Sequence, residues 1–567
     1  MVMQPCRLWA ALALCLGTTP ALAQSGGSRF CGDLAALALP ATTIATAEEV
    51  TGGSFTPPGA TTPQTGLPAF CRVAGSISPV EGSRIGFEAW LPLQGWNGRY
   101  LQVGNGGYAG TIQYGNLAPM LRLGFATAST DDGHDASGPT GSWALGQPQR
   151  IIDFGYRAVH QTALRAKEIV QAFYGRPQDY AYWNGCSEGG REGLMEAQRF
   201  PADFDGVLAG APAQYFTHLQ AAGVWNQQAL QADPASTIPA SKAPAIQAAA
   251  LAQCDAAGDG VQDGIVGDVR ACRFDPSVLL CQGEDNDTCL TPKQVTALTR
   301  VQRGAHNPRT GQRLFTGYQP GAEAEPSANW NAWFWSGPQA NQFVYGDALF
   351  QYFVYDDPAW DWRSFDFDTD LFQADSKPIA EQSLGRVMNA VSPDLRAFAG
   401  RGGKLIQYHG LNDPAIAPYS INYYESVLAH ARRGGAADPV RETQAYYRYY
   451  SVPGMGHCSG GPGPNAFGQQ GSLPVPADPQ HNVLLALQRW VEEGVPPEAI
   501  IATKYQGDQA ANGVAATRPL CPYPQTAVHD GAGDPKQAGS FHCVDLGLSL
   551  ATNPGLTPAR QPVSPTR

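Results

Sequence analysis

Ser187 lies at the centre of Gly-Cys-Ser-Glu-Gly at positions 185–189, between a predicted strand over 180–183 and a predicted helix over 191–200. A Gly-x-Ser-x-Gly turn between a strand and a helix raises a serine hydroxyl above a sheet, and its glycines leave room for neighbouring backbone and for a substrate. The helix N-terminus and the Glu188 N–H group can stabilise the oxyanion that forms when such a hydroxyl attacks a carbonyl group. The pattern therefore predicts nucleophilic catalysis by Ser187, against the alternative of an incidental serine in a glycine-rich turn.

A serine nucleophile needs a base. Among the ten histidines, His457 stands out because it follows a predicted strand over 446–452 in a glycine-rich loop, which can bring an imidazole to the edge of a sheet. His409 and His134 are the rival bases, although His134 precedes Ser187 and enzymes with this type of turn place the histidine last. His457 is the predicted base.

The acid that orients the base is expected between Ser187 and His457, because the order along the chain is serine, acid, histidine. Asp413 follows a predicted strand over 404–408, in a turn at the strand end. Its carboxylate would hold the required tautomer of His457 and stabilise the imidazolium. The alternative is an ordinary Asx turn before Pro414.

The cysteines offer an independent check of this arrangement. Cys186 precedes the predicted nucleophile and Cys458 follows the predicted base, so the two are expected to bridge if Ser187 and His457 meet. Local spacing suggests three further pairs and elimination leaves a fourth: Cys254 with Cys272, Cys281 with Cys289, Cys521 with Cys543, and Cys31 with Cys71. Spacing by itself leaves the connectivity open.

A glycine-rich loop over 104–110 follows another predicted strand. In a hydrolase this loop offers a second oxyanion donor, from Gly106 or Gly107, and one such donor is typically worth about 10²- to 10³-fold in rate. The same loop fits a dinucleotide pattern with Asp131 at a later strand end, so nicotinamide binding is the alternative. An exported protein rarely meets free nicotinamide nucleotides. Gly107 and Glu188 are therefore the predicted oxyanion donors.

Three aspartates, Asp255, Asp259 and Asp263, are interspersed with glycines inside one of the expected disulfide loops. Calcium prefers six to eight oxygen ligands, so the backbone carbonyl groups of Val261 and Ile265 would have to complete the shell. The spacing is not that of an EF-hand. The segment predicts a structural calcium ion remote from the chemistry, against a solvated acidic loop, and no organic cofactor is predicted.

Strands and helices alternate along the chain. Further strands are predicted over 87–93, 99–103, 124–130 and 206–210, and a helix over 151–174. This order indicates an α/β protein with a mostly parallel sheet, and the serine turn makes it an expected α/β-hydrolase fold with a large inserted lid domain. This alternation of strands and helices stops between about residues 214 and 399. The predicted domains are a core over 24–213 and 400–553, a lid over 214–399 and a disordered tail over 554–567.

The first 23 residues combine Arg7, an apolar run over 8–16 and Ala-Leu-Ala at 21–23, which is the layout of a secretory signal peptide. Ten cysteines remain after it, an even number that favours disulfides in an oxidising compartment. No stretch of sequence is apolar enough to span a bilayer. The net charge of −12 disfavours binding to nucleic acid or to an anionic membrane. The protein is predicted to be soluble, and secreted or periplasmic.

The motifs together resemble those of a known family. With Gly-Cys-Ser-Glu-Gly-Gly at 185–190, His-Gly-Leu-Asn-Asp at 409–413, Gly-Met-Gly-His-Cys at 454–458 and the acidic segment over 254–264, the chain resembles the tannase and feruloyl esterase family from about residue 31 to 543. That family also contains hydrolases of mono(2-hydroxyethyl) terephthalate. The resemblance implies a triad with a bridging disulfide, two oxyanion donors, a lid and lid-bound calcium, on the residues named above. One departure is that Asp255 and Asp259 are one residue further apart than expected.

The resemblance also implies a small-molecule substrate that is an ester of an aromatic acid, which a tryptophan-rich lid suits. Trp335 and Ser336 are expected where the lid meets the aryl group, and Ile416 is a further expected substrate contact. An ordinary lid core is the alternative for the tryptophans. Asn331 stands where the terephthalate hydrolases have an arginine for the free carboxylate, which favours feruloyl, galloyl or related phenolic esters.

The sequence therefore predicts a secreted serine carboxylic ester hydrolase that acts through an acyl-enzyme. One alternative is a mono(2-hydroxyethyl) terephthalate hydrolase of the same family. The alternative from another class is an inactive, calcium-stabilised exported binding protein.

Overall fold

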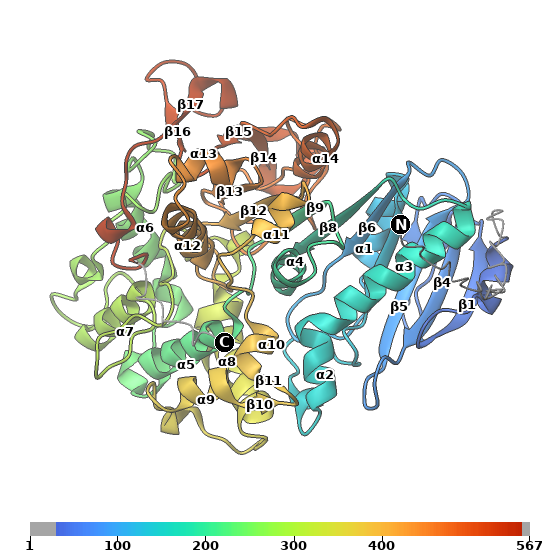
Figure 1. The fold of residues 1–567 in the computed structure, drawn as a ribbon. Helices are drawn as coiled ribbons and strands as arrows, with labels where there is room; N and C mark the ends of the chain where they lie inside the picture. Colours follow the sequence, from blue (N-terminus) through green and yellow to red (C-terminus); the bar gives the residue numbers. More distant parts are fainter. Residues whose placement is uncertain (1–29, 558–567) are drawn as a thin grey trace, which may run out of the picture.

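A nine-stranded mixed sheet runs through the centre of the structure (Figure 1). The computed structural model describes residues 30–557, and the signal peptide predicted over 1–23 lies outside them. In spatial order the strands are β1 (Thr42–Val50), β4 (Phe70–Ile77), β5 (Ile85–Pro92), β7 (Ala126–Thr130), β6 (Arg99–Val103), β8 (Tyr180–Cys186), β9 (Gly206–Gly210), β12 (Lys404–Gly410) and β13 (Tyr447–Val452). Neighbouring strands pair antiparallel from β1 to β7 and parallel from β7 to β13. The parallel part has the α/β character that the sequence predicts.

Helices cover both faces of the sheet because side chains along each strand alternate between two cores. On β12, for example, Leu405 belongs to one buried cluster and Ile406 to the other. The first cluster is covered by α3 (Ala158–Tyr174), α4 (Glu188–Arg199) and α12 (Tyr419–Arg433), and the second by α1 (Tyr114–Arg122) and α14 (Val483–Glu493). The loops at the ends of the parallel strands are therefore held between two packed layers.

Residues 211–403 form an insertion between the neighbouring strands β9 and β12, and this insertion is called the lid below. Its helices are α5 (Phe216–Gln231), α6 (Ala243–Cys254), α7 (Pro292–Arg303), α8 (Asn341–Ala348), α9 (Asp370–Ser376), α10 (Leu384–Met388) and α11 (Arg396–Gly400). Figure 1 shows α5 to α9, in green and yellow, gathered beside the sheet. The lid predicted over 214–399 falls within this insertion.

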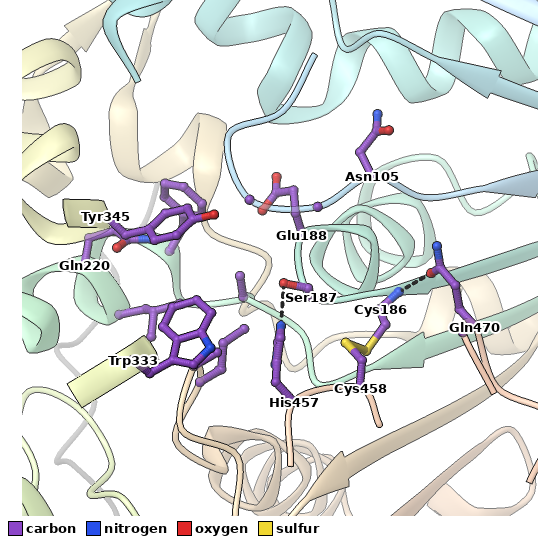
Figure 2. Close-up of a pocket in the computed structure, with 18 of the residues that line it drawn as sticks. Asn105, Cys186, Ser187, Glu188, Gln220, Trp333, Tyr345, His457, Cys458 and Gln470 are labelled. Atoms are coloured by element: carbon purple, nitrogen blue, oxygen red, sulfur yellow. Dashed lines mark hydrogen bonds between the residues drawn. A yellow bond between two sulfur atoms is a disulfide. The ribbon is translucent and has the colours of Figure 1, made fainter. Parts of the chain in front are cut away.

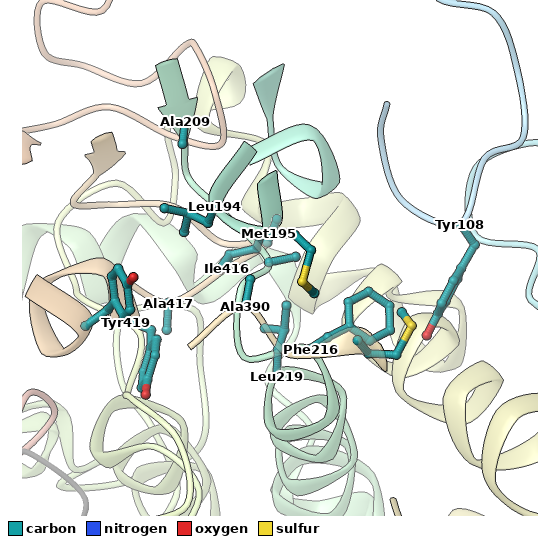
Figure 3. Close-up of a cluster of buried hydrophobic side chains, with 14 of the residues drawn as sticks. Tyr108, Leu194, Met195, Ala209, Phe216, Leu219, Ala390, Ile416, Ala417 and Tyr419 are labelled. Atoms are coloured by element: carbon teal, nitrogen blue, oxygen red, sulfur yellow. The ribbon is translucent and has the colours of Figure 1, made fainter. Parts of the chain in front are cut away.

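The lid and the core share apolar packing (Figure 3). Leu194 and Met195 of α4 belong to the same buried cluster as Phe216 and Leu219 of α5 and Ile416 of the loop after β12. Burial of such side chains contributes roughly 1.5–3 kcal/mol each. The lid is therefore anchored on the helix that follows Ser187.

The chain after α14 forms two hairpins, β14 (Ile500–Tyr505) with β15 (Val514–Leu520) and β16 (Thr526–His529) with β17 (Phe541–Val544). Five disulfides join the five predicted pairs: Cys31–Cys71, Cys186–Cys458, Cys254–Cys272, Cys281–Cys289 and Cys521–Cys543. Within residues 30–557, no helix is both long and apolar enough to cross a membrane.

The predicted disordered tail needs a correction at its start. Leu556 is 0% exposed, and its carbonyl oxygen accepts a hydrogen bond from the Asn422 side chain at 2.8 Å. Arg313 donates to the carbonyl oxygen of Gly555 at 2.8 Å. Residues 554–557 are thus packed on the lid and on α12, because the buried Leu556 side chain and these hydrogen bonds fix a segment whose Pro- and Thr-rich composition suggested disorder. Residues 558–567 lie outside the described part of the chain.

Candidate active site

Ser187 lies on the turn between β8 and α4, with φ 65° and ψ −121°. This left-handed conformation is strained for a serine and is held by its surroundings, since the Ser187 N–H donates to the Gly210 carbonyl oxygen at 3.0 Å. A Cβ atom on Gly185 would lie 2.4 Å from the Gly189 carbonyl oxygen, and one on Gly189 would lie 2.9 Å from the Gly104 Cα. Only glycine fits on either side, as the sequence predicts.

Three turns from distant parts of the chain meet at the site, and Figure 2 shows His457 pointing toward Ser187. His457, after β13, places Nε2 2.9 Å from Ser187 Oγ and Nδ1 2.7 Å from Asp413 Oδ2. The other Asp413 oxygen accepts the N–H groups of Ala415 at 2.7 Å and Ile416 at 2.9 Å. Burial would raise the pKa of Asp413, but two neighbouring histidines hold it well below its ordinary value. The arrangement can transfer the hydroxyl proton to a correctly oriented imidazole.

The rival bases do not hydrogen-bond to Ser187 in the part of the chain that the structure describes. His409 lies beside Asp413, with Nε2 3.4 Å from Oδ2, but its ring nitrogens also contact a serine hydroxyl at 2.7 Å and a backbone carbonyl oxygen at 3.0 Å. His134 contacts the Tyr108 carbonyl oxygen at 2.9 Å, and burial lowers its pKa. Both histidines therefore bind backbone carbonyl groups rather than Ser187.

Two links hold the loops of the site together. The Cys186–Cys458 disulfide joins the serine turn to the His457 loop, with Cα atoms 6.1 Å apart across 272 residues of sequence. Gln470 forms the second link, because its Oε1 accepts the Cys186 N–H at 2.7 Å and its Nε2 donates to the Gly104 carbonyl oxygen at 3.3 Å. The serine turn, the histidine loop and the glycine-rich loop are thus one connected unit.

The glycine-rich loop lies against the N-terminus of α4, where Gly189 N–H donates to the Asn105 carbonyl oxygen at 2.9 Å. Among the described residues, the N–H groups of Gly107 and Glu188 donate to no protein acceptor, and both residues line the cavity beside the serine. Free N–H groups at a helix N-terminus are suited to an oxyanion. The structure therefore brings both predicted oxyanion donors to the site.

A cavity of about 410 Å³ opens beside Ser187. Apolar side chains from the lid and the core form part of its wall: Phe216, Leu219, Trp333, Tyr345 and Ile416. Amide side chains form another part: Gln113, Asn116, Gln220 and Gln470. Within residues 30–557, no lysine or arginine lines the cavity. A small neutral molecule with an aromatic group fits such a wall.

Of the four expected substrate contacts, only Ile416 lines the cavity. Asn331 and Ser336 are exposed to solvent on the lid. Trp335 is 8% exposed and stacks on Trp330, with ring centroids 6.1 Å apart. The expectation for these three residues is corrected: they belong to the lid surface and the lid core.

Trp333 is the lid residue that the sequence analysis missed. Its ring centroid lies 5.9 Å from that of His457 and 5.7 Å from that of Tyr345, which also lines the cavity. Residues Asn331–Trp335 form a π-helical turn, which has no hydrophobic period that would show which tryptophan faces the site. The cluster of tryptophans in the sequence therefore indicates the part of the lid that lies near the site, but it does not indicate which tryptophan lines the cavity.

The predicted calcium ligands lie in the loop closed by the Cys254–Cys272 disulfide. The Asp255 carboxylate accepts three backbone N–H groups of the loop, at 3.0, 3.1 and 3.2 Å. Arg518 donates to Asp259 Oδ2 at 3.1 Å and to Asp263. In this arrangement the residues do not fit a calcium ion, because two carboxylates share one guanidinium and the third is bonded to backbone. The calcium ion, with the carbonyl groups of Val261 and Ile265 as ligands, stays a prediction.

A strand-to-helix turn that carries a serine, followed by acid and histidine loops after later parallel strands, defines an α/β-hydrolase fold, here with a large inserted lid. The crystal structure of feruloyl esterase B from Aspergillus oryzae superposes with a TM-score of 0.81 and 31% sequence identity, covering 91% of this chain and 99% of that one. The chain belongs to the tannase and feruloyl esterase family, whose profile matches residues 71–544.

Two relatives agree with this assignment. An uncharacterized esterase of Xanthomonas campestris is 47% identical over 536 residues, which is 92% of either chain. Feruloyl esterase B of Aspergillus niger is 33% identical over 478 residues, which is 84% of this chain and 86% of that one. The chain is therefore an esterase of the feruloyl esterase and tannase type, and nicotinamide binding at the glycine-rich loop is not favoured.

Proposed function

We propose that this protein is an exported serine esterase that cleaves esters of feruloyl, galloyl or related phenolic acids through an acyl-enzyme. The observation that carries the proposal is the line from Ser187 Oγ through His457 to Asp413 at the edge of a cavity with aromatic walls. An inactive binding protein has no need for three oriented groups that meet from distant turns.

The proposed reaction uses groups already described. Ser187 Oγ bonds to the ester carbonyl carbon while its proton passes to His457 Nε2, and the oxyanion accepts the N–H groups of Gly107 and Glu188. Collapse of this intermediate breaks the bond to the alcohol oxygen, which takes the proton from His457. Water then repeats the sequence on the acyl-enzyme and releases the acid.

The cavity wall favours a neutral phenolic acyl group. Trp333 and Tyr345 offer ring faces, and the Gln220 amide offers a hydrogen-bonding partner for a phenol hydroxyl. A terephthalate monoester carries a free carboxylate, and burying that charge without a cation is costly. No lysine or arginine from the described part of the chain lines the wall, which supports phenolic esters over the terephthalate monoester.

Export is part of the proposal. Five disulfides close loops in the core, the lid and the C-terminal hairpins. Disulfides of this number persist in the periplasm or outside the cell rather than in a reducing cytosol.

Initial rates with methyl ferulate, methyl gallate and mono(2-hydroxyethyl) terephthalate test the proposal. We expect the two phenolic esters to give higher kcat/KM than the terephthalate ester. Ser187→Ala is expected to lower kcat by on the order of 10⁴-fold or more without loss of folding. Full activity in this variant, or a preference for the terephthalate ester, would overturn the corresponding part of the proposal.

A further inference from the structure

Two buried carboxyl groups lie behind the glycine-rich loop that carries Gly107. Asp132, after β7, is 0% exposed, and Glu192, four residues after Glu188 on α4, is 2% exposed. Neither group takes part in the chemistry proposed above. A buried carboxyl group is costly unless it is paired with a cation or protonated, so this pair requires an explanation.

Each carboxyl group holds Asn105 with one oxygen and leaves the other oxygen without a donor. Glu192 Oε2 accepts the Asn105 backbone N–H at 3.0 Å, and Asp132 Oδ2 accepts the Asn105 side-chain N–H at 2.6 Å. Among the described residues, Glu192 Oε1 and Asp132 Oδ1 have no donor, and the two carboxyl groups converge on the same asparagine. Two such acceptors are satisfied when one of them carries a proton.

The charge of Arg191 lowers the pKa of Glu192, but the Arg191 guanidinium hydrogen-bonds to other groups. The Arg191 guanidinium donates to Glu188 at 2.6 Å and to three backbone carbonyl oxygens at 2.7, 2.9 and 3.3 Å. Burial and the charge of Glu188 raise the pKa of Glu192 to about 7. Burial and the charge of Glu192 raise the pKa of Asp132 well above its ordinary value. The pair therefore keeps one proton at neutral pH.

We propose that a proton shared between Asp132 and Glu192 holds Asn105, and through it the Gly107 N–H group, in position to stabilise the oxyanion. The proposal rests on the proposed function, and it makes Asp132 and Glu192 positioning residues, since neither lines the cavity. Asn105 links the glycine-rich loop to α4, because its carbonyl oxygen accepts the Gly189 N–H at 2.9 Å. One asparagine thus ties together the loop and the helix that supply the two oxyanion donors.

The shared proton makes the loop sensitive to alkaline pH. The groups that face the pair are Glu188, Arg191 and Glu196 from α4 and Asn105 from the loop. The protonated pair stabilises the loop below its pKa, and this stabilisation is lost as the pH rises through that value. Two buried negative charges would then repel each other and release Asn105. We therefore expect kcat to fall as the pH rises above the pKa of the pair.

Isosteric variants distinguish the effect of the shared proton from the effect of side-chain shape. In Glu192→Gln the amide oxygen can accept the Asn105 N–H and the amide N–H₂ can donate to Asp132, so kcat at pH 7 should stay close to that of the wild type. The alkaline fall in kcat should move to higher pH. Glu192→Ala removes the acceptor of Asn105 and is expected to lower kcat by about 10²-fold with little change in KM, as for the loss of one oxyanion donor.

Glu196→Gln is the matched control, because Glu196 is a buried glutamate on α4, 1% exposed, and its carboxyl oxygens accept no hydrogen bond from the described residues. It should leave kcat at pH 7 unchanged and should move the alkaline fall in kcat much less than Glu192→Gln does, because the charge of Glu192 is a minor influence on Glu196. Thermal unfolding of each variant reports folding. A second readout does not need activity: the infrared difference spectrum of the wild type minus the Asp132→Asn, Glu192→Gln double variant at pH 7 should contain the carbonyl band of a buried protonated carboxyl.

The outcomes distinguish this proposal from the proposed function. If Ser187→Ala keeps full activity, the serine mechanism fails, and the infrared band still decides whether the pair shares a proton. If Glu192→Gln loses as much kcat as Glu192→Ala, the shape or charge of the carboxylate matters and the shared proton is refuted. An unchanged alkaline limb in Glu192→Gln refutes it as well.

We also infer, from a separate set of contacts, that Arg518 takes the structural role that a calcium ion was predicted to have. Arg518 lies on β15 and its side chain is 4% exposed. Its guanidinium joins Asp259 and Asp263 of the lid and lies 4.3 Å from the centre of the Phe541 ring on β17. One arginine therefore ties the acidic loop of the lid to both C-terminal hairpins.

Metal analysis and thermal unfolding of the purified protein test this inference. We expect no stoichiometric calcium and the same Tm with excess EDTA or with CaCl₂. Arg518→Ala should lower Tm, and CaCl₂ should restore part of the loss because the freed carboxylates offer the oxygen ligands that calcium prefers. Arg309→Ala, which removes an ion pair to Asp368 from an arginine that is 72% exposed, is the control and should change Tm little.

Bound calcium in the wild type, or a lower Tm in EDTA, would overturn the role of Arg518 and support the predicted calcium site. An unchanged Tm in Arg518→Ala would refute the inference as well.

Discussion

Replacing Asp413 by asparagine tests the orientation of His457 with a change of one atom. Asp413 Oδ1 accepts the N–H groups of Ala415 at 2.7 Å and Ile416 at 2.9 Å. The asparagine oxygen must take that place, so its N–H₂ group takes the place of Oδ2, 2.7 Å from His457 Nδ1. Nδ1 then has to accept, and the ring proton moves to Nε2. There it faces the Ser187 hydroxyl and cannot receive its proton.

The size of the expected fall in kcat follows from two competing orientations of the asparagine amide. The favoured placement has the wrong tautomer, which costs about 10⁴-fold in kcat. The flipped amide keeps the right tautomer but leaves two buried N–H groups unsatisfied, each costing about 1–3 kcal/mol, so its population stays below about one in thirty. We therefore expect kcat for methyl ferulate to fall between about 30-fold and 10⁴-fold, with KM little changed.

Steady-state kinetics measure this effect, and thermal unfolding checks that the variant is folded. Asp478→Asn is the matched control, because Asp478 also pairs with a histidine, His481, at 2.9 Å, but is exposed and away from the cavity. It should leave kcat unchanged. If Asp413→Asn kept a kcat near that of the wild type, the reasoning on the tautomer of His457 would be refuted.

Three further predictions concern stability and specificity. Replacing both Cys186 and Cys458 by serine opens a loop of 272 residues and is expected to lower the free energy of unfolding by up to about 5 kcal/mol; an unchanged Tm under non-reducing conditions would contradict this. Trp333→Ala removes an aromatic wall and should raise KM for methyl ferulate by about three- to tenfold, with p-nitrophenyl acetate, which lacks the phenolic acyl group, affected less; equal effects on both esters would argue against a ring contact. Burial raises the pKa of Glu323 to about 7, and Glu323 accepts the Gly321 N–H, so its contribution to stability is present at acidic pH and lost as the pH rises through 7. Glu323→Gln should therefore be more stable than the wild type at pH 9, by about 3 kcal/mol; parallel pH profiles of Tm for the two proteins would count against this.

The convergence of Ser187, Asp413 and His457 could be predicted from the sequence because each one lies in the turn that follows a strand. Parallel strands end at the same edge of a sheet, so a serine after β8, an aspartate after β12 and a histidine after β13 are brought close by the fold itself. The cysteines beside Ser187 and His457 add a geometric condition that few other histidines meet. Local pattern and global topology agree at these positions, and the prediction needed no side-chain packing.

The lid could not be predicted in the same way. Trp333 and Trp335 are two residues apart in a π-helical turn, and only the packing of Trp335 on Trp330 decides which ring faces the cavity. Arg518 is 259 residues from Asp259 in sequence, so no local spacing indicates that the two meet. Contacts of this kind depend on tertiary packing, for which a single sequence carries no periodic signal.

The placement of the lid explains how substrate choice can change without loss of the chemistry. The lid begins directly after Gly210, whose carbonyl oxygen accepts the Ser187 N–H at 3.0 Å, and it ends at β12, which leads into Asp413. Both ends are therefore fixed beside the reacting groups by the sheet, whereas Trp333 and Tyr345 lie in the middle of the insertion. Substitutions there alter the wall of the cavity but leave the backbone of the serine and aspartate turns in place. A change of the preferred acyl group should accordingly require changes near residues 333–345, and the same changes should leave kcat for a small ester almost unaltered.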